Sequence, residues 1–94
     1  MPLPDDDIRA ALPSLSGWSQ SGKAIERTFK FSDFVAAMAF VNRIAEAAEQ
    51  ANHHPDIAIH YNQVTLSLWS HDSGGVTNRD LKMAARINQL HEQK

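Results

Sequence analysis

Two adjacent histidines, His53 and His54, close an apolar helical pattern and are followed directly by Pro55. Imidazole exchanges protons near neutral pH, so neighbouring histidines can supply an acid and a base to one reaction. Proline fixes its own φ and disfavours helical geometry at the residue before it, so His54 should lie outside the helix. We therefore expect a helix end and a fixed turn that present both rings.

Two more residues could complete an acid–base site around this turn. Glu49 precedes His53 by four residues, the spacing at which a helical carboxylate can orient an imidazolium. His71 follows the second strand of a predicted hairpin, and antiparallel pairing can return it to the start of the first strand. The sequence thus predicts a cluster of His53, His54, His71 and Glu49.

The same histidines also have simpler interpretations. His53 could be only a favourable cation at a helix C-terminus, with Pro55 as the helix stop. A lone histidine before a loop, such as His71, is more often a surface residue, and His60 and His91 have that character. The residue types alone leave these alternatives open.

A metal site is a rival interpretation, with three histidines and Asp56 or Asp72 as oxygen donors. No HExxH-type spacing supports it, and adjacent histidines rarely bind the same ion, so we predict no metal.

Three other side chains have both a structural and a functional interpretation. Asp80 forms a T-x-x-D arrangement with Thr77, which is typical of a helix N-terminus. Trp18 and Trp69 could each belong to the core or form a flat wall for an aromatic ligand.

The elements that position these residues follow from hydrophobic periodicity. We predict a short helix near 5–12, a short strand ending near 22, a strand over 23–31, a long helix over about 32–51, a hairpin of strands over about 57–61 and 64–68, and a last helix from 77. Asn62-Gln63 is the expected two-residue turn of the hairpin. This order predicts an α+β fold, in which an antiparallel sheet carries helices on one face and leaves the other partly open.

Two patterns within these elements need a tertiary explanation. On the second strand, Ile25, Phe29 and Phe31 share a face that Arg27 interrupts; a buried partner, an edge position or a ligand could explain this arginine. The long helix has two apolar stripes, and either a broad core-facing surface or a subunit contact could require both. The stripes are Phe34, Val35, Met38, Val41, Asn42, Ala45 and Ala48, and beside them Phe40, Ile44, Ala47 and Ala51.

Composition places the chain among ordinary globular proteins. Its 94 residues are 43% hydrophobic and 21% charged, which predicts a single domain over residues 1–94. A formal charge of −2 gives no basic surface for nucleic acid or anionic membrane. The acidic N-terminal residues do not resemble a signal peptide, no apolar run could span a bilayer, and cysteine is absent, so we expect a cytoplasmic protein. Self-association would help so small a domain to bury surface.

The motifs together resemble the pterin-4a-carbinolamine dehydratase family. The residues that carry the resemblance are Glu49-x3-His53-His54-Pro55, then Tyr61-Asn62 and Val64, then His71, Gly74-Gly75, Thr77 and Asp80, with Gly17-Trp18 and Phe29-Lys30-Phe31 before them. The resemblance covers the chain from about Leu12 to Leu90. One departure is Ile57, where many members have a tryptophan that lines the pterin pocket.

The resemblance implies a four-stranded antiparallel sheet with three helices packed on one face. The implied reaction is loss of water from a 4a-hydroxytetrahydropterin to give quinonoid dihydropterin, without a metal or an organic cofactor. This recycles the pterin of aromatic amino acid hydroxylases such as phenylalanine hydroxylase. Homodimers or homotetramers are also implied; a non-catalytic interaction module on the same fold, acting as a coactivator or assembly factor, is the alternative.

The resemblance also implies roles for individual residues. His53, His54 and His71 match the active-site histidines, and Glu49, Pro55 and Asp80 match flanking positions of the family's site. Our hypothesis is that His53 and His71 protonate the departing hydroxyl and that His54 anchors the pterin and takes the N5 proton. Glu49 would hold His53 in place, while Asp80 and Trp18 would contact the pterin ring.

Overall fold

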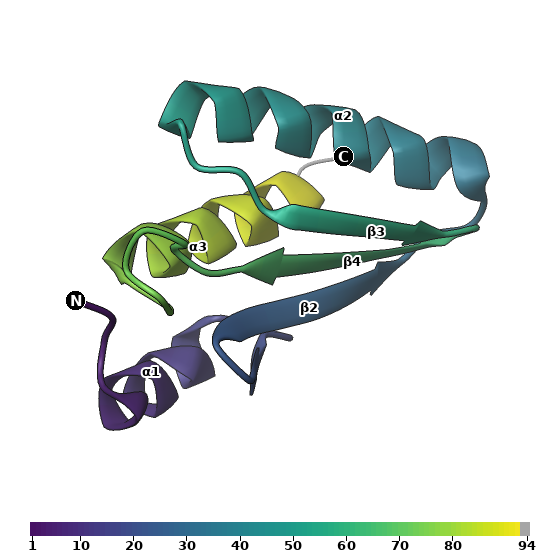
Figure 1. Ribbon diagram of the computed structural model, residues 1–94. Coiled ribbons are helices and arrows are strands. Elements are labelled where there is room, and N and C mark those ends of the chain that lie inside the picture. The colour runs from purple at the N-terminus through teal and green to yellow at the C-terminus, as the bar shows by residue number, and fades with distance from the viewer. Residues whose placement is uncertain (93–94) are drawn as a thin grey trace.

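Antiparallel pairing joins β1 (Ser19–Ser21), β2 (Ala24–Lys30), β4 (Gln63–Leu68) and β3 (Asp56–His60), in this order, into one four-stranded sheet. The computed structural model describes residues 1–92, over which three α-helices accompany this sheet (Figure 1). The elements are α1 (Asp5–Ala11), a 3₁₀-helix (Leu12–Ser14), β1 (Ser19–Ser21), β2 (Ala24–Lys30), α2 (Phe34–Ala51), β3 (Asp56–His60), β4 (Gln63–Leu68) and α3 (Asn78–Glu92). The predicted α+β class and element order are confirmed.

One apolar core lies between the sheet and the helices. Strand alternation places Ile25 and Phe29 of β2 beside Leu68 and Val64 of β4, and all four are buried. The helices contribute buried residues to the same cluster, namely Ile8 of α1, Ala37, Phe40, Ile44, Ala47 and Ala48 of α2, and Met83, Ala84, Ile87 and Leu90 of α3. Because there is one shared cluster, the helices cover one face of the sheet.

The two stripes of α2 have different environments. Phe40 and Ile44, from the second stripe, are fully buried. Phe34 and Val35, from the first, are 48% and 75% exposed. α2 runs alongside the edge strand β3 (Figure 1). The core therefore accounts for one stripe and leaves much of the other on the surface.

The β3–β4 hairpin turns one residue earlier than predicted. Its two-residue turn is Tyr61-Asn62, with Tyr61 at φ +54°, and His60 is paired with Gln63. The Asn62 side-chain amide donates to the Phe31 carbonyl oxygen, which ties the turn to the end of β2. This register keeps Val64 on the core face, whereas a slip of one residue would expose it.

Arg27 lies on the core side of the sheet with polar partners. Its guanidinium donates to the Ser16 carbonyl oxygen and to Asn88 Oδ1, each at 2.7 Å, and lies 4.3 Å from the centre of the Phe29 ring. Burial lowers the pKa of Arg27, although nearby Glu92 partly offsets this. Of the three explanations offered for this arginine, the structure supports the first, because Arg27 has partly buried partners.

Gly17 makes room for the Arg27 side chain. Gly17 has φ +85°, and a Cβ atom there would lie 2.4 Å from Arg27 Nε.

Residues 1–92 contain no helix long and apolar enough to cross a membrane.

We expect Gly17→Ala to lower the free energy of unfolding by about 2–3 kcal/mol, because it combines backbone strain with a clash against Arg27. Gly22→Ala is the matched control, since Gly22 has φ +57° but a Cβ atom added there would meet no atom within 4 Å. The control should cost only about 1 kcal/mol. Urea unfolding measures both, and equal losses would show that the Arg27 contact contributes nothing.

Candidate active site

The end of α2 sets the direction of both histidine side chains. Asn52 adopts a left-handed conformation at φ 52°, and its N–H donates to the carbonyl oxygens of Ala48 and Glu49. The His53 N–H also donates to the Ala48 carbonyl oxygen, at 3.1 Å. These bonds satisfy carbonyls at the helix end and turn the chain away from the helix axis. His53 and His54 therefore both lie outside the helix.

The β3–β4 hairpin brings His71 to the same place. Asp56 at the start of β3 is paired with Ser67 near the end of β4, so the residues flanking these positions are neighbours. Beyond β4, Ser70 and Gly75 form a bridge that closes the short loop containing His71. The three histidines line one open cavity of about 360 Å³, together with Asn52, Pro55, Asp56, Trp69, Ser70, Asp72 and Arg79.

His53 is held by a buried carboxyl group. Its Nε2 atom lies 2.5 Å from Asp80 Oδ1, and the two side chains are 11% and 0% exposed. Because a carboxylate can only accept, Nε2 carries the hydrogen in this contact, which leaves Nδ1 as the ring nitrogen that could exchange a proton with a ligand. A carboxylate behind an imidazole fixes the orientation of the ring.

Asp80 is itself fixed by neighbours from two segments. Its Oδ2 atom accepts from Ser70 Oγ at 2.9 Å and from the Thr77 backbone N–H at 2.8 Å. The predicted capping contact between Asp80 and the Thr77 position at the start of α3 is therefore present. The Asp80 side chain is fully buried and lies behind His53, a position that differs from the direct pterin contact that we predicted for it.

Glu49 has a different partner from the one predicted. Its Oε2 atom lies 2.5 Å from His54 Nε2, and the two side chains are 78% and 56% exposed. The i, i+4 spacing to His53 has no effect because the helix ends at Ala51 and Asn52 turns the chain. Such an exposed pair orients His54 but contributes little stability.

The flat surface in the cavity comes from Trp69, which stacks on His71 with ring centres 3.8 Å apart and planes at 28°. Trp18, predicted as a pterin contact, lies instead in the core at 5% exposure and donates through Nε1 to Asn88. Ile57 lies on β3, outside the residues that line this cavity. Pro55 does line it.

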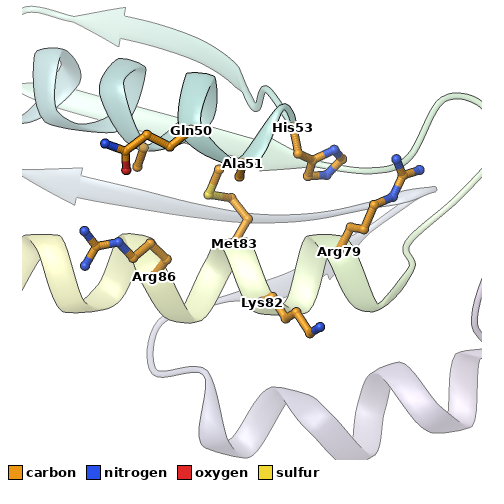
Figure 2. Close-up of a pocket in the computed structure, with 8 residues that line it drawn as sticks. Gln50, Ala51, His53, Arg79, Lys82, Met83 and Arg86 are labelled. Atoms are coloured by element: carbon orange, nitrogen blue, oxygen red, sulfur yellow. The ribbon is translucent and has the colours of Figure 1, made fainter.

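Ser70 and Arg79 are site residues that the sequence did not single out, since isolated serine and arginine carry no spacing signal. Arg79 donates to Asp72 Oδ1 at 2.6 Å, and this hydrogen bond lowers the pKa of the Asp72 carboxyl group. Figure 2 shows the Arg79 guanidinium beside His53. Within residues 1–92, no three histidine, cysteine or acidic side chains converge as metal ligands.

His91, which we expected at the surface, packs half-buried against the aromatic rings of Phe29, Phe31 and Phe40. It therefore belongs to the edge of the core and not to the histidine cavity.

Known proteins are similar in sequence to this chain over nearly its whole length. The model of a family described as pterin 4 alpha carbinolamine dehydratase matches residues 1–90. A protein of Koribacter versatilis is 60% identical over 89 residues, which cover 95% of each chain. A protein of Gloeobacter violaceus is 55% identical over 86 residues, 87% of this chain and 94% of that one. Both are provisionally named as pterin-4-alpha-carbinolamine dehydratases.

Two solved structures share the fold. A crystal structure of a "transcriptional coactivator/pterin dehydratase" from Brucella melitensis has a TM-score of 0.91 and 38% identity, over 96% of this chain and 98% of that one. A pterin dehydratase-like protein described as a RuBisCO assembly factor of the alpha-carboxysome has a TM-score of 0.64 and 20% identity, over 78% and 84% of the two chains. The second shows a likeness of fold alone.

We expect Asp80→Asn to lower the free energy of unfolding by about 1–3 kcal/mol, because the amide replaces a fully buried carboxyl group that is hydrogen-bonded to His53, Ser70 and Thr77. Asp72→Asn is the matched control, since Asp72 is exposed and has a single arginine partner; it should change stability by no more than about 0.5 kcal/mol. Chemical denaturation compares them, and a neutral Asp80→Asn would contradict this description of the site.

Proposed function

The chain belongs to the pterin 4 alpha carbinolamine dehydratase family, and from this we propose that it removes water from 4a-hydroxytetrahydropterin to give quinonoid dihydropterin. The observation that carries the proposal is the convergence of His53, His54 and His71 on one cavity, with carboxyl groups behind His53 and His54. A cavity of about 360 Å³ is also of the size that small-molecule sites have.

The reaction requires two proton transfers. A proton must reach the hydroxyl group on C4a so that it leaves as water, and the proton on N5 must be removed so that the C4a–N5 double bond forms. In the proposed mechanism His53, oriented by Asp80, and His71 act as acids towards the hydroxyl, which takes one proton and leaves as water. His54, oriented by Glu49, anchors the ring and takes the N5 proton. Asp80 thus replaces Glu49 as the residue that orients His53.

Trp69 supports the same assignment by offering a flat surface. It lines the histidine cavity and stacks on His71, so a planar pterin could lie against neighbouring aromatic rings. The elimination has no redox step, so the proposal includes no cofactor. We also propose that the protein is cytoplasmic and that an aromatic amino acid hydroxylase, such as phenylalanine hydroxylase, produces its substrate.

Synthetic 4a-hydroxytetrahydropterin should lose water much faster with the protein than in buffer. His53→Ala and His71→Ala should each lower the rate by about 10²-fold, because each removes a proton donor. His54→Ala should also slow the reaction, through loss of the N5 proton acceptor. Stopped-flow absorbance follows the decay, with circular dichroism to confirm that each variant folds.

His60→Ala is the matched control, because His60 lies exposed on β3 outside the cavity and should keep the full rate. No acceleration by the wild type would exclude the enzyme and favour the non-catalytic interaction module. Equal rates for His53→Ala and His60→Ala would remove His53 from the mechanism.

Self-association is the second part of the proposal, and the surface along β3 and α2 supports it. Ile57 and Ile59 on the edge strand are 39% and 41% exposed. Phe34 and Val35 are exposed at the start of α2, the helix that runs alongside β3 (Figure 1). The unpaired backbone of an edge strand is a template for pairing with another strand. A second copy of the chain would cover both features.

The wild type should elute as a dimer or tetramer in size-exclusion chromatography with light scattering. Ile59→Lys with Val35→Lys should shift it towards monomer, because buried charge opposes the contact. Ala85→Lys is the control, since Ala85 lies exposed on α3 away from this surface. A wild type that is monomeric at all concentrations would contradict self-association.

A further inference from the structure

A second cavity opens from the histidine cavity along the groove between α2 and α3. It has a volume of about 410 Å³ and shares His53 and Arg79 with the histidine cavity. Its apolar lining consists of Ala47, Ala51 and Met83. The proposed mechanism uses nothing in this groove except the His53 ring at its end, so the groove needs its own explanation.

The charged side chains of the groove all have one sign. Arg79, Lys82 and Arg86 line it from α3, and its other polar residues, Gln50 and His53, carry no carboxyl group. Figure 2 shows Arg79 beside His53 at one end and Arg86 at the other, with Met83 between the helices. Arg86 lies seven positions after Arg79 on α3, a rise of about 10 Å along the helix.

Two of these cations have no acidic partner among the residues that the structure describes. Arg79 is paired with Asp72, but Lys82 and Arg86 form no ion pair with any of residues 1–92. Both are exposed, and neither is needed to complete the core. In a chain whose formal charge is −2, unpaired cations gathered along one groove favour an anionic ligand there.

A smaller cavity of about 170 Å³ adjoins the groove and shares Ala47, Gln50 and Arg86 with it. Arg43 and Glu46 of α2 line this extension, so a carboxylate enters the lining only beyond Arg86. The positive stretch therefore lies between His53 and Arg86, next to the histidine cavity.

The chemistry of the pterin connects the two cavities. In the proposed reaction C4a and N5 must face the histidines, and C6, which carries the ring's side chain, is bonded to N5. The side chain must therefore leave the ring beside the reacting edge. His53 lines both the histidine cavity and the groove, so the groove lies next to the reacting edge and offers this side chain a path along α3.

Resting on the proposed function, we propose that the substrate is a pterin whose C6 side chain carries an anionic group, a phosphate ester or a carboxylate, bound by Lys82 and Arg86. The apolar lining covers the carbon chain, and the two cations bind its charged end. An acidic peptide is a less suitable occupant, because the groove leads directly to the proton-transfer residue His53.

The test compares three 4a-hydroxytetrahydropterins whose C6 side chains end in a hydroxyl, a phosphate or a carboxylate. With the wild type, kcat/KM should be at least about tenfold higher for a charged substrate than for the hydroxyl one at low salt, and this preference should shrink at high salt. The better of the two charged substrates identifies the anionic group. Equal kcat/KM for all three would overturn the inference while leaving the dehydratase intact.

Lys82→Gln with Arg86→Gln should abolish most of this preference, as measured by the ratio of kcat/KM values. The control Lys23→Gln with Lys30→Gln removes the same charge from exposed positions outside the groove and should keep the ratio. Arg79 stays unchanged because it also holds Asp72. A ratio that falls equally in both pairs would show a general charge effect and overturn the assignment to Lys82 and Arg86.

A binding measurement separates the two proposals. Calorimetric titration with unreactive dihydropterins, with and without a side-chain phosphate, should show about tenfold tighter binding of the phosphate form by the wild type and by the control pair, but not by the groove pair. If the protein dehydrates none of the three substrates, the proposed function fails. The titration then still tests whether Lys82 and Arg86 bind the anionic side chain. Inorganic phosphate should compete with the phosphate form only.

Discussion

The contact between His53 and Asp80 is the interaction on which the proposed site depends. It joins the end of α2 to the start of α3, 27 residues apart in the chain, and it fixes one imidazole against a fully buried carboxyl group. A buried carboxyl group is stable only when its hydrogen-bond acceptors are used. Here Ser70 and the Thr77 backbone complete the set, and Ser70 adjoins His71. One small polar network thus organises the helix ends and the loop that carries the third histidine.

The sheet determines which residues this network can reach. Because Asp56 is paired with Ser67, the turn before β3 and the loop after β4 lie side by side at the same end of the hairpin. The register itself follows from burial, since Val64, Leu66 and Leu68 are all 0% exposed and a slip of one residue would expose them. Core packing therefore places the histidines, although none of the three belongs to the core.

The site and the surface that we propose for self-association draw on separate parts of α2. Its last turn and the Asn52 cap direct the histidines, while Phe34 and Val35 lie exposed at its start. The groove that leaves the histidine cavity uses a third part, the side of α2 that faces α3. Of its two apolar stripes, one is largely buried in the core and much of the other lies on the surface.

Hydrophobic periodicity, the His-His-Pro turn and the hairpin pattern are local signals, and they were enough to predict the element order, the antiparallel sheet and the set of histidines near one turn. The sequence did not determine which carboxyl group orients which histidine. The spacing predicted that Glu49 would contact His53. Because Asn52 is left-handed and turns the chain, Glu49 instead contacts His54, and His53 contacts Asp80. The sequence likewise could not place Trp18 in the core and Trp69 in the cavity. The partner of a side chain depends on where the backbone changes direction and on which distant segments come into contact. Both follow from the packing of the whole chain and leave no signal in local spacing.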